Sequence, residues 1–416
     1  MQKTNANSRI IFVVCCLFLS QLNAQHISNE LTNEYDFIIL DSPGKLFTMR
    51  QINQNYLSLY RMIIPAIDSI GWSKKISNTV EVALTGLVFI TLTHEEGHRS
   101  ILTGKNIGSI SNPFFNNRGA ATVIGVTNET LKNLRDNSFP DYIRLHTAGL
   151  ESDYMLANRV ETLCSFGEEK FSTIKWEYYF RKVALLQYYM LGLFKYSADL
   201  EEEVNELERD IVGHDVYGAI RHLYRPDMEF YRYTDYDDLT GDEKSFVKRA
   251  GWRSLLNIVN PLVIGKSGFD LSESMRINAG LGYTMTPFGD QIDQNIWLMY
   301  NEYNMHIYLR EFENKSSWFL GAGLKLHKLK LTDNINISVG FDFWNQPKNL
   351  NFNTKDAQSG GSIDLQIYYK VMSRISSNVK SLAILLGGNY KSSGYLPEEF
   401  YLNEHFGFLI GCAVSM

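Results

Sequence analysis

Apolar residues recur with two different periods along this chain, and the change from one to the other falls near residue 265. In the first part they follow the period of a helix, for example at Leu57, Tyr60, Ile64 and Ile67. In the second part they alternate with polar or small residues, which is the period of a strand. Eight alternating runs cover residues 275–285, 296–300, 303–312, 318–326, 335–343, 363–369, 381–390 and 406–414. The pattern predicts an α+β protein with a mostly helical part, residues 25–265, followed by an eight-stranded antiparallel β-barrel, residues 266–416.

The two faces of these strands differ in character. One face carries apolar and aromatic side chains, among them Trp318, Phe341, Phe343, Phe406 and Phe408, and the other is largely Gly, Asn, Ser and Asp. A narrow eight-stranded lumen suits small residues, whereas large aromatics suit a face turned toward lipid. The alternation therefore favours a barrel of the outer-membrane type, with outer-membrane lipid as a partner. A soluble sandwich or a lipocalin-like barrel remains the alternative.

An apolar helical run, residues 82–92, ends in Thr93-His94-Glu95-Glu96-Gly97-His98. His94 and His98 lie one turn apart on one helix face, so two imidazole nitrogens can converge on one ion. Glu95 lies about 100° round the helix, where its carboxylate can take a proton from a water that the ion has acidified. The motif predicts a zinc site with Glu95 as the catalytic base. The alternative is a pair of core histidines beside a solvated glutamate.

A later helix, expected over residues 142–163, offers the third metal ligand. Glu151 is the favoured candidate, because Gly149 beside it would let this helix approach the metal helix closely. Asp153 and His146 are the alternates, since they share one helix face. Either Glu151 binds the metal with Asp153 supporting a ligand, or Asp153 binds it with His146 nearby. Farther on, His214 could stabilise an oxyanion, but capping or packing are its simpler roles.

The run His94-Glu95-x-x-His98 resembles the zincin metallopeptidases over roughly residues 77–163. With Glu151 on a second helix, the chain is similar to gluzincins, in which such a helix supplies a glutamate ligand. The gap between His98 and Glu151 resembles that of membrane-associated families, which place an aspartate four residues after the glutamate. This chain has Met155 there. The resemblance implies a zincin-like fold for the helical part and peptide-bond hydrolysis at zinc.

The first residues and the composition of the chain indicate where the protein is located and which partners are excluded. Residues 1–24 have the basic start, short apolar core and small-residue exit of a secretory signal. The net charge of the whole chain is −6, and loss of Lys3 and Arg9 with the signal makes it −8, which argues against nucleic acid as a partner. Cys164 and Cys412 are far apart in the sequence, so no disulfide framework is expected.

Together these patterns predict a zinc-dependent metallopeptidase in the outer membrane of a Gram-negative bacterium. Its metalloprotease domain is expected to face the periplasm and to act on a peptide or protein substrate. Two other classes stay open: a non-catalytic outer-membrane binding or assembly protein with a structural or absent metal, and a metal-dependent lipid or amide hydrolase. Glu95 favours an enzyme, because a structural metal site needs ligands but no base.

Overall fold

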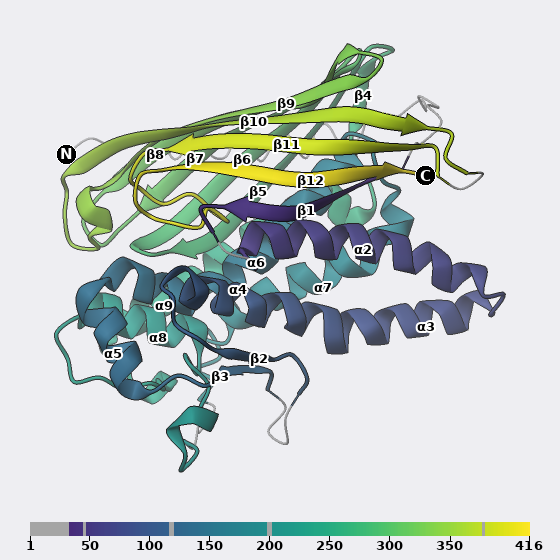
Figure 1. Cartoon of the computed structure of the whole chain (residues 1–416). Coiled ribbons are helices and arrows are strands. Elements are labelled where there is room, and N and C mark those ends of the chain that lie inside the picture. The colour runs from purple at the N-terminus through teal and green to yellow at the C-terminus, as the bar shows by residue number, and fades with distance from the viewer. Residues whose placement is uncertain (1–32, 45–46, 116–119, 198–201, 377–378) are drawn as a thin grey trace.

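The computed structural model describes residues 33–44, 47–115, 120–197, 202–376 and 379–416. The expected signal segment, residues 1–24, lies outside these residues. A large curved sheet forms one layer of the molecule, and helices cover its concave face and lie beneath it (Figure 1). The helices are α2 (Met49–Ser69), α3 (Lys74–Leu84), the π-helix η1 (Thr85–Phe89), α4 (Ile90–Gly104), α5 (Asn128–Asn137), α6 (Phe139–Ser165), α7 (Phe171–Met190), α8 (Asp215–Tyr224) and α9 (Gly241–Arg253), with short 3₁₀ turns that include η4 (Ser254–Ile258) and η5 (Pro261–Ile264).

The sheet has ten strands in the order β1-β12-β11-β10-β9-β8-β7-β6-β5-β4. All of its neighbouring strands pair antiparallel. The strands are β1 (Glu34–Ser42), β4 (Phe269–Ser272), β5 (Met275–Thr286), β6 (Gly289–Tyr300), β7 (Tyr303–Glu313), β8 (Trp318–Thr332), β9 (Ile335–Pro347), β10 (Ala357–Ser373), β11 (Ser381–Lys391) and β12 (His405–Ser415). A separate hairpin, β2 (Ile110–Asn112) with β3 (Thr122–Ile124), lies against α4.

The expectation of a dominant helical domain followed by an eight-stranded barrel is wrong. Each of the eight alternating runs lies in one of the strands β5 to β12, but β1 and β4 extend the sheet at its two ends, and in the described structure these ends do not pair. The sheet is open. The predicted boundary near residue 265 also does not separate the two layers, since residues 34–42 supply β1, which pairs with β12.

The reason the sheet stays open is visible at β1 and on the concave face. Asn55 of α2 both accepts from the Ile38 amide (2.7 Å) and donates to its carbonyl (2.8 Å), so a helix takes the place that another strand would fill. The long helix α6 lies across β5 and β6, with the Tyr154 hydroxyl donating to Asp293 at 2.7 Å and the Trp297 indole donating to Thr162 at 2.9 Å. A helix thus occupies the space that a small closed barrel would fill with side chains.

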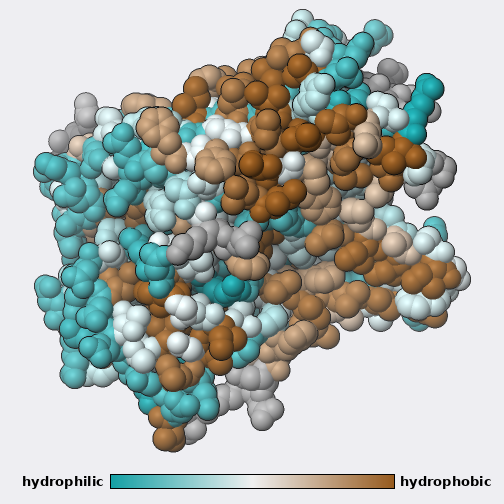
Figure 2. Space-filling view, in the orientation of Figure 1, coloured by the Kyte–Doolittle hydropathy of each residue, from teal (hydrophilic) through white to brown (hydrophobic). Residues whose placement is uncertain are grey.

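Helices α3, η1 and α4 run on continuously. This stretch, Lys74–Gly104, is the one helix of the described residues that is long and apolar enough, by length and composition, to cross a membrane. Its first half is mostly half-buried or exposed, and its second half, from Thr91, is mostly buried in the protein. Hydrophobic side chains gather over the strands and over the projecting α2–α3 pair in Figure 2, whereas hydrophilic side chains line the edge of the molecule near α5.

Candidate metal centre

The site forms where α4 crosses α6 at close range. A Cβ at Gly97 of α4 would lie 2.6 Å from the Ala148 carbonyl oxygen of α6, so only glycine fits between the two helices. Ser152 of α6 also holds the crossing, donating its hydroxyl to the Thr93 carbonyl at 3.0 Å. This contact fixes the face of α4 that carries the two histidines against α6.

Both histidines are buried, and each has its outer ring nitrogen anchored. Nδ1 of His94 lies 2.8 Å from the Asp153 carboxylate, and Nδ1 of His98 lies 2.6 Å from the Leu145 carbonyl oxygen. A proton on each Nδ1 satisfies these acceptors and leaves the lone pair on each Nε2. This is the arrangement that orients metal-binding histidines in proteins.

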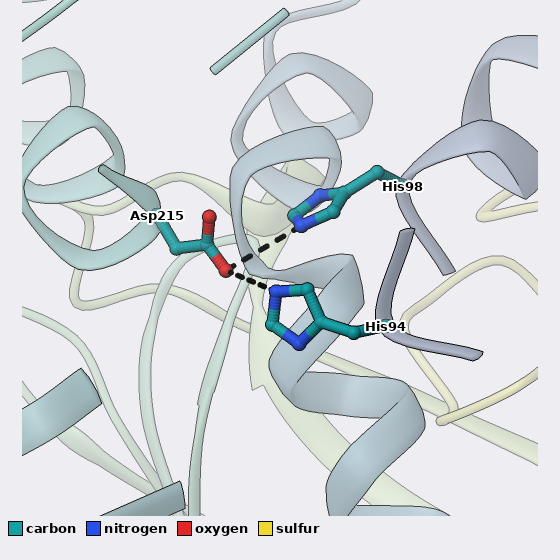
Figure 3. A group of neighbouring side chains, drawn as sticks. All are labelled: His94, His98 and Asp215. Atoms are coloured by element: carbon teal, nitrogen blue, oxygen red, sulfur yellow. Dashed lines mark ion pairs between the residues drawn. The ribbon is translucent and has the colours of Figure 1, made fainter. Parts of the chain in front are cut away.

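Asp215 completes the group from the first turn of α8. Its Oδ2 lies 3.2 Å from Nε2 of His94 and 3.4 Å from Nε2 of His98 (Figure 3). One ligand atom from each of the three residues lies within 4.8 Å of the others. Ligands at about 2.0–2.1 Å from a tetrahedral zinc ion are about 3.3 Å apart. The two measured separations therefore fit the edges of a zinc tetrahedron.

Gly149 leaves room at the two Nε2 atoms. A Cβ built at this position would lie 2.4 Å from Nε2 of His94 and 2.5 Å from Nε2 of His98. A side chain here would enter the space in front of both nitrogens, where a shared ion would sit. Gly149 thus has a role at the centre itself, besides allowing α6 to approach α4.

The charges around the histidines favour a positive charge at the centre. Burial alone would lower the pKa of His94, yet Asp153 and Asp215 raise it well above its ordinary value. Burial opposes the charged form of His98 in the same way, and Asp215 raises its pKa. The pKa of Asp215 is held far below its usual range by the two imidazoles, although burial favours its neutral form. Without a metal, protons on the imidazoles supply this charge, and a divalent cation can replace them.

Glu95 is buried beside this cluster. Burial raises its pKa to about 8, against the opposing effect of His94 and His98, which favour its charged form. Its neighbour Glu96 turns away and accepts two hydrogen bonds from Arg99, each at 2.9 Å. Of the two adjacent glutamates, Glu95 is the one that interacts electrostatically with both imidazoles.

The structure separates the residues that the sequence proposed as third ligand. Glu151 is not in the cluster: it is paired with Arg144 at 2.6 Å and accepts from the Glu398 amide at 2.7 Å. Gly149 faces the imidazoles, and a residue two positions farther along a helix lies about 200° round, so Glu151 must face away. Asp153, four positions after Gly149, returns to the site face and holds His94.

Arg181 holds in place the Asp153 carboxylate that anchors His94. Its guanidinium donates to Asp153 at 2.5 Å and to Glu177 at 2.7 Å, and Glu177 accepts from the Tyr56 hydroxyl at 2.5 Å. The side chains of Asp153, Glu177 and Arg181 are all fully buried. His94 is thus held by a chain of charge-assisted hydrogen bonds that runs from α4 to α7 and α2.

The other two candidate histidines have separate environments. His146 is fully buried, and neither of its ring nitrogens has a hydrogen-bond partner among the described residues. Its ring lies against Tyr142 and His222, and burial lowers its pKa to about 3. His214 caps α8, accepting from the Tyr217 amide at 3.4 Å and stacking on the Tyr217 ring.

Asp215 is not among the ligands predicted from the sequence, although its neighbour His214 is among the candidate site residues. The available signal was an acidic residue at the first position of a helix, directly after Gly213 and His214. Such residues are common because they interact favourably with the helix dipole, so the signal alone does not indicate a ligand. A comparison of the chain with family models and with curated proteins found no match.

Proposed function

We propose that this protein is a zinc-dependent peptidase in which His94, His98 and Asp215 hold the metal. The observation that carries the proposal is the convergence of two anchored imidazoles and one carboxylate at the separations of a zinc tetrahedron. Three protein ligands leave the fourth position of a zinc ion open, as in catalytic sites. The ion would supply Lewis-acid activation of a water and of the substrate carbonyl.

Glu95 supports an enzyme over a structural metal site. Its carboxylate is close enough to both imidazoles and to Asp215 for their charges to act on its pKa. A cation at the centre favours the ionised form of Glu95, which can then accept a proton from the attacking water. The same group can return that proton to the leaving amine.

The hairpin beside α4 supports a peptide as substrate. β2 lies against α4 and pairs with β3 on one side in the described structure, and Ile110 in β2 is 60% exposed. An extended peptide can add to such an edge strand through backbone hydrogen bonds. The reaction would take place at the periplasmic side of an outer membrane, the location that the signal-like sequence and the strand pattern predict.

The decisive experiment combines metal analysis with cleavage of a mixed peptide library. The purified full chain should carry about one zinc per chain and cleave peptides until a chelator removes the metal. Glu95→Gln should keep the zinc and lose cleavage, because an amide cannot accept the proton. Glu96→Gln is the matched control and should behave as the wild type. If Glu95→Gln cleaves at the wild-type rate, or the wild type binds no zinc, the proposal is wrong.

A further inference from the structure

We propose that lipid hydrocarbon covers one continuous outer surface of this protein, formed by the convex face of the sheet and the outward faces of α2 and α3. This surface is called the apolar belt below. On the strands it comprises Ile307, Leu309, Leu320, Phe341, Phe343, Ile363, Leu365, Ile367, Tyr369, Ile384, Leu386, Phe406, Phe408 and Ile410, and on the helices Leu59, Ile63, Ile70, Ile76 and Leu87. The inference stands independently of the metal site.

The helical part of the belt is apolar on its outer face. On α2 and directly after it, Leu59, Ile63 and Ile70 are 49%, 38% and 56% exposed, and their spacing places them on one helix face. The opposite face of α2 is also apolar and is buried, and α3 adds Glu81, which accepts from the Tyr60 hydroxyl at 3.1 Å. A helix at the surface of a protein in water exposes a polar face. The second half of α2 instead carries apolar residues on both faces.

The sheet has its polarity inverted around the cavity on its concave face. This face carries ion pairs such as Arg310 with Asp293 (2.7 Å) and Lys328 with Asp36 (3.1 Å), around a cavity of about 250 Å³. The convex face carries exposed aliphatic and aromatic side chains. Strands with charged residues inside and apolar residues outside have the pattern that a hydrocarbon surrounding selects.

The edges of the sheet provide an independent observation. Unpaired backbone groups are costly in hydrocarbon, where no water can bond to them. Along β1, polar side chains of α2 take these bonds: besides Asn55 at Ile38, Gln51 donates to the Ile39 carbonyl (3.0 Å) and Ser58 to the Asp36 carbonyl (2.6 Å). These bonds leave fewer unpaired backbone groups along the edge that lipid would contact.

At the opposite edge of the sheet, side chains from the helical layer also bond to the strand backbone. They do so along the part of β5 that does not pair with the short strand β4. Asn257 of η4 exchanges two hydrogen bonds, each 2.9 Å, with the backbone of Tyr283 in β5. The Tyr189 hydroxyl of α7 accepts from the Met285 amide at 2.9 Å. Helices therefore cover the backbone at both edges of the open sheet, and they complete the wall that lipid would contact.

The dimensions of the belt fit a bilayer. On β10 the outward apolar residues run from Ile363 to Val371, a stretch of nine residues, which agrees with the roughly 9–11 residues of a tilted transmembrane strand. The tip of the α2–α3 pair exposes Trp72, Lys74 and Lys75, residue types that settle at a membrane interface. A second copy of the chain would cover one patch, whereas a bilayer contacts strands and helices together (Figure 2).

The test places a fluorescent bimane label at single cysteines in a background in which Cys15, Cys16, Cys164 and Cys412 are all replaced by alanine, and circular dichroism checks the fold. Leu365→Cys in β10 and Ile63→Cys in α2 report on the belt, and Lys132→Cys on exposed α5 is the matched control. The full chain is reconstituted into phosphatidylethanolamine/phosphatidylglycerol vesicles with and without dibrominated phosphatidylcholine, and aqueous iodide is the second quencher.

Lipid contact predicts several-fold stronger quenching by the brominated lipid at Leu365→Cys and Ile63→Cys than at Lys132→Cys, and the opposite order with iodide. Iodide quenching at all three positions would show that water covers the belt and would overturn the proposal. Protection from both quenchers at Leu365→Cys and Ile63→Cys, together with crosslinking to another polypeptide or a second copy, would show a protein occupant and would also overturn it.

Discussion

On the concave face of the sheet, buried charges meet each other in pairs, as Arg310 meets Asp293 and Lys328 meets Asp36. At the crossing of α4 and α6, two Nε2 atoms and one carboxylate oxygen instead face a common point, with their outer atoms already anchored. Charges that satisfy each other contribute to a scaffold, whereas lone pairs that converge form a binding site. Substitutions on the concave face should therefore lower stability, whereas substitutions at the crossing of α4 and α6 should weaken metal binding.

The largest effect is expected in the scaffold. Arg310→Met leaves the buried Asp293 without its partner, which should lower the free energy of unfolding by about 3–5 kcal/mol. Denaturant titration of the protein in detergent micelles measures this, and zinc content per folded chain should not change. The control is Lys330→Met, whose pair with Asp333 is exposed and screened by water, so this substitution should leave stability nearly unchanged. Equal losses in the two variants would mean that the concave face is as solvated as the surface.

Substitutions at the metal centre should have the opposite effect, because they should remove the metal and leave the fold intact. Asp215→Ala should weaken zinc binding by more than about 100-fold, since loss of a residue that only supports a ligand already costs about 10–100-fold. Competition with a chromophoric chelator measures the affinity. Glu151→Gln should keep the wild-type zinc affinity while losing stability, because it leaves Arg144 partly unpaired. Release of zinc by Glu151→Gln, but not by Asp215→Ala, would restore the ligand set predicted from the sequence.

Features that depend on neighbouring residues in the chain could be predicted from the sequence. Alternation within each run located strands β5 to β12, and the one-turn spacing placed His94 and His98 on one face of a helix. Asn55 at the edge of β1 and Asp215 in α8 depend on contacts between segments far apart in the chain, and no local period records such contacts. Glu151 lies away from the imidazoles because Gly149, two residues earlier, faces them.

Gly149 sharpens the contrast further, because it lies in the site without offering a ligand atom. Gly149→Ala should weaken zinc binding by about 10–100-fold, as its Cβ would displace the two imidazoles from their common point. The same chelator competition applies. Gly104→Ala at the end of α4 is the control, since its Cβ would meet only Phe400 at an ordinary 3.4 Å. Wild-type affinity in Gly149→Ala would show that the ion, if bound, sits away from the two Nε2 atoms.

The smallest effect concerns His146, a buried polar group that is neither paired nor part of the cluster. Burial lowers its pKa to about 3 in the folded protein, whereas in the unfolded chain it has its ordinary value near 6.5. The unfolded chain therefore binds a proton that the folded protein does not as the pH falls below 6.5, so the contribution of neutral His146 to stability is complete above that pH and declines below it. The free energy of unfolding should fall by about 1 kcal/mol between pH 6.5 and 5.5 through this group. His146→Leu should remove that part of the pH dependence while leaving stability at pH 8 nearly unchanged, and denaturant titrations of both proteins at the three pH values measure the difference. An unchanged slope in His146→Leu would mean that His146 has the same pKa in the folded protein as in the unfolded chain.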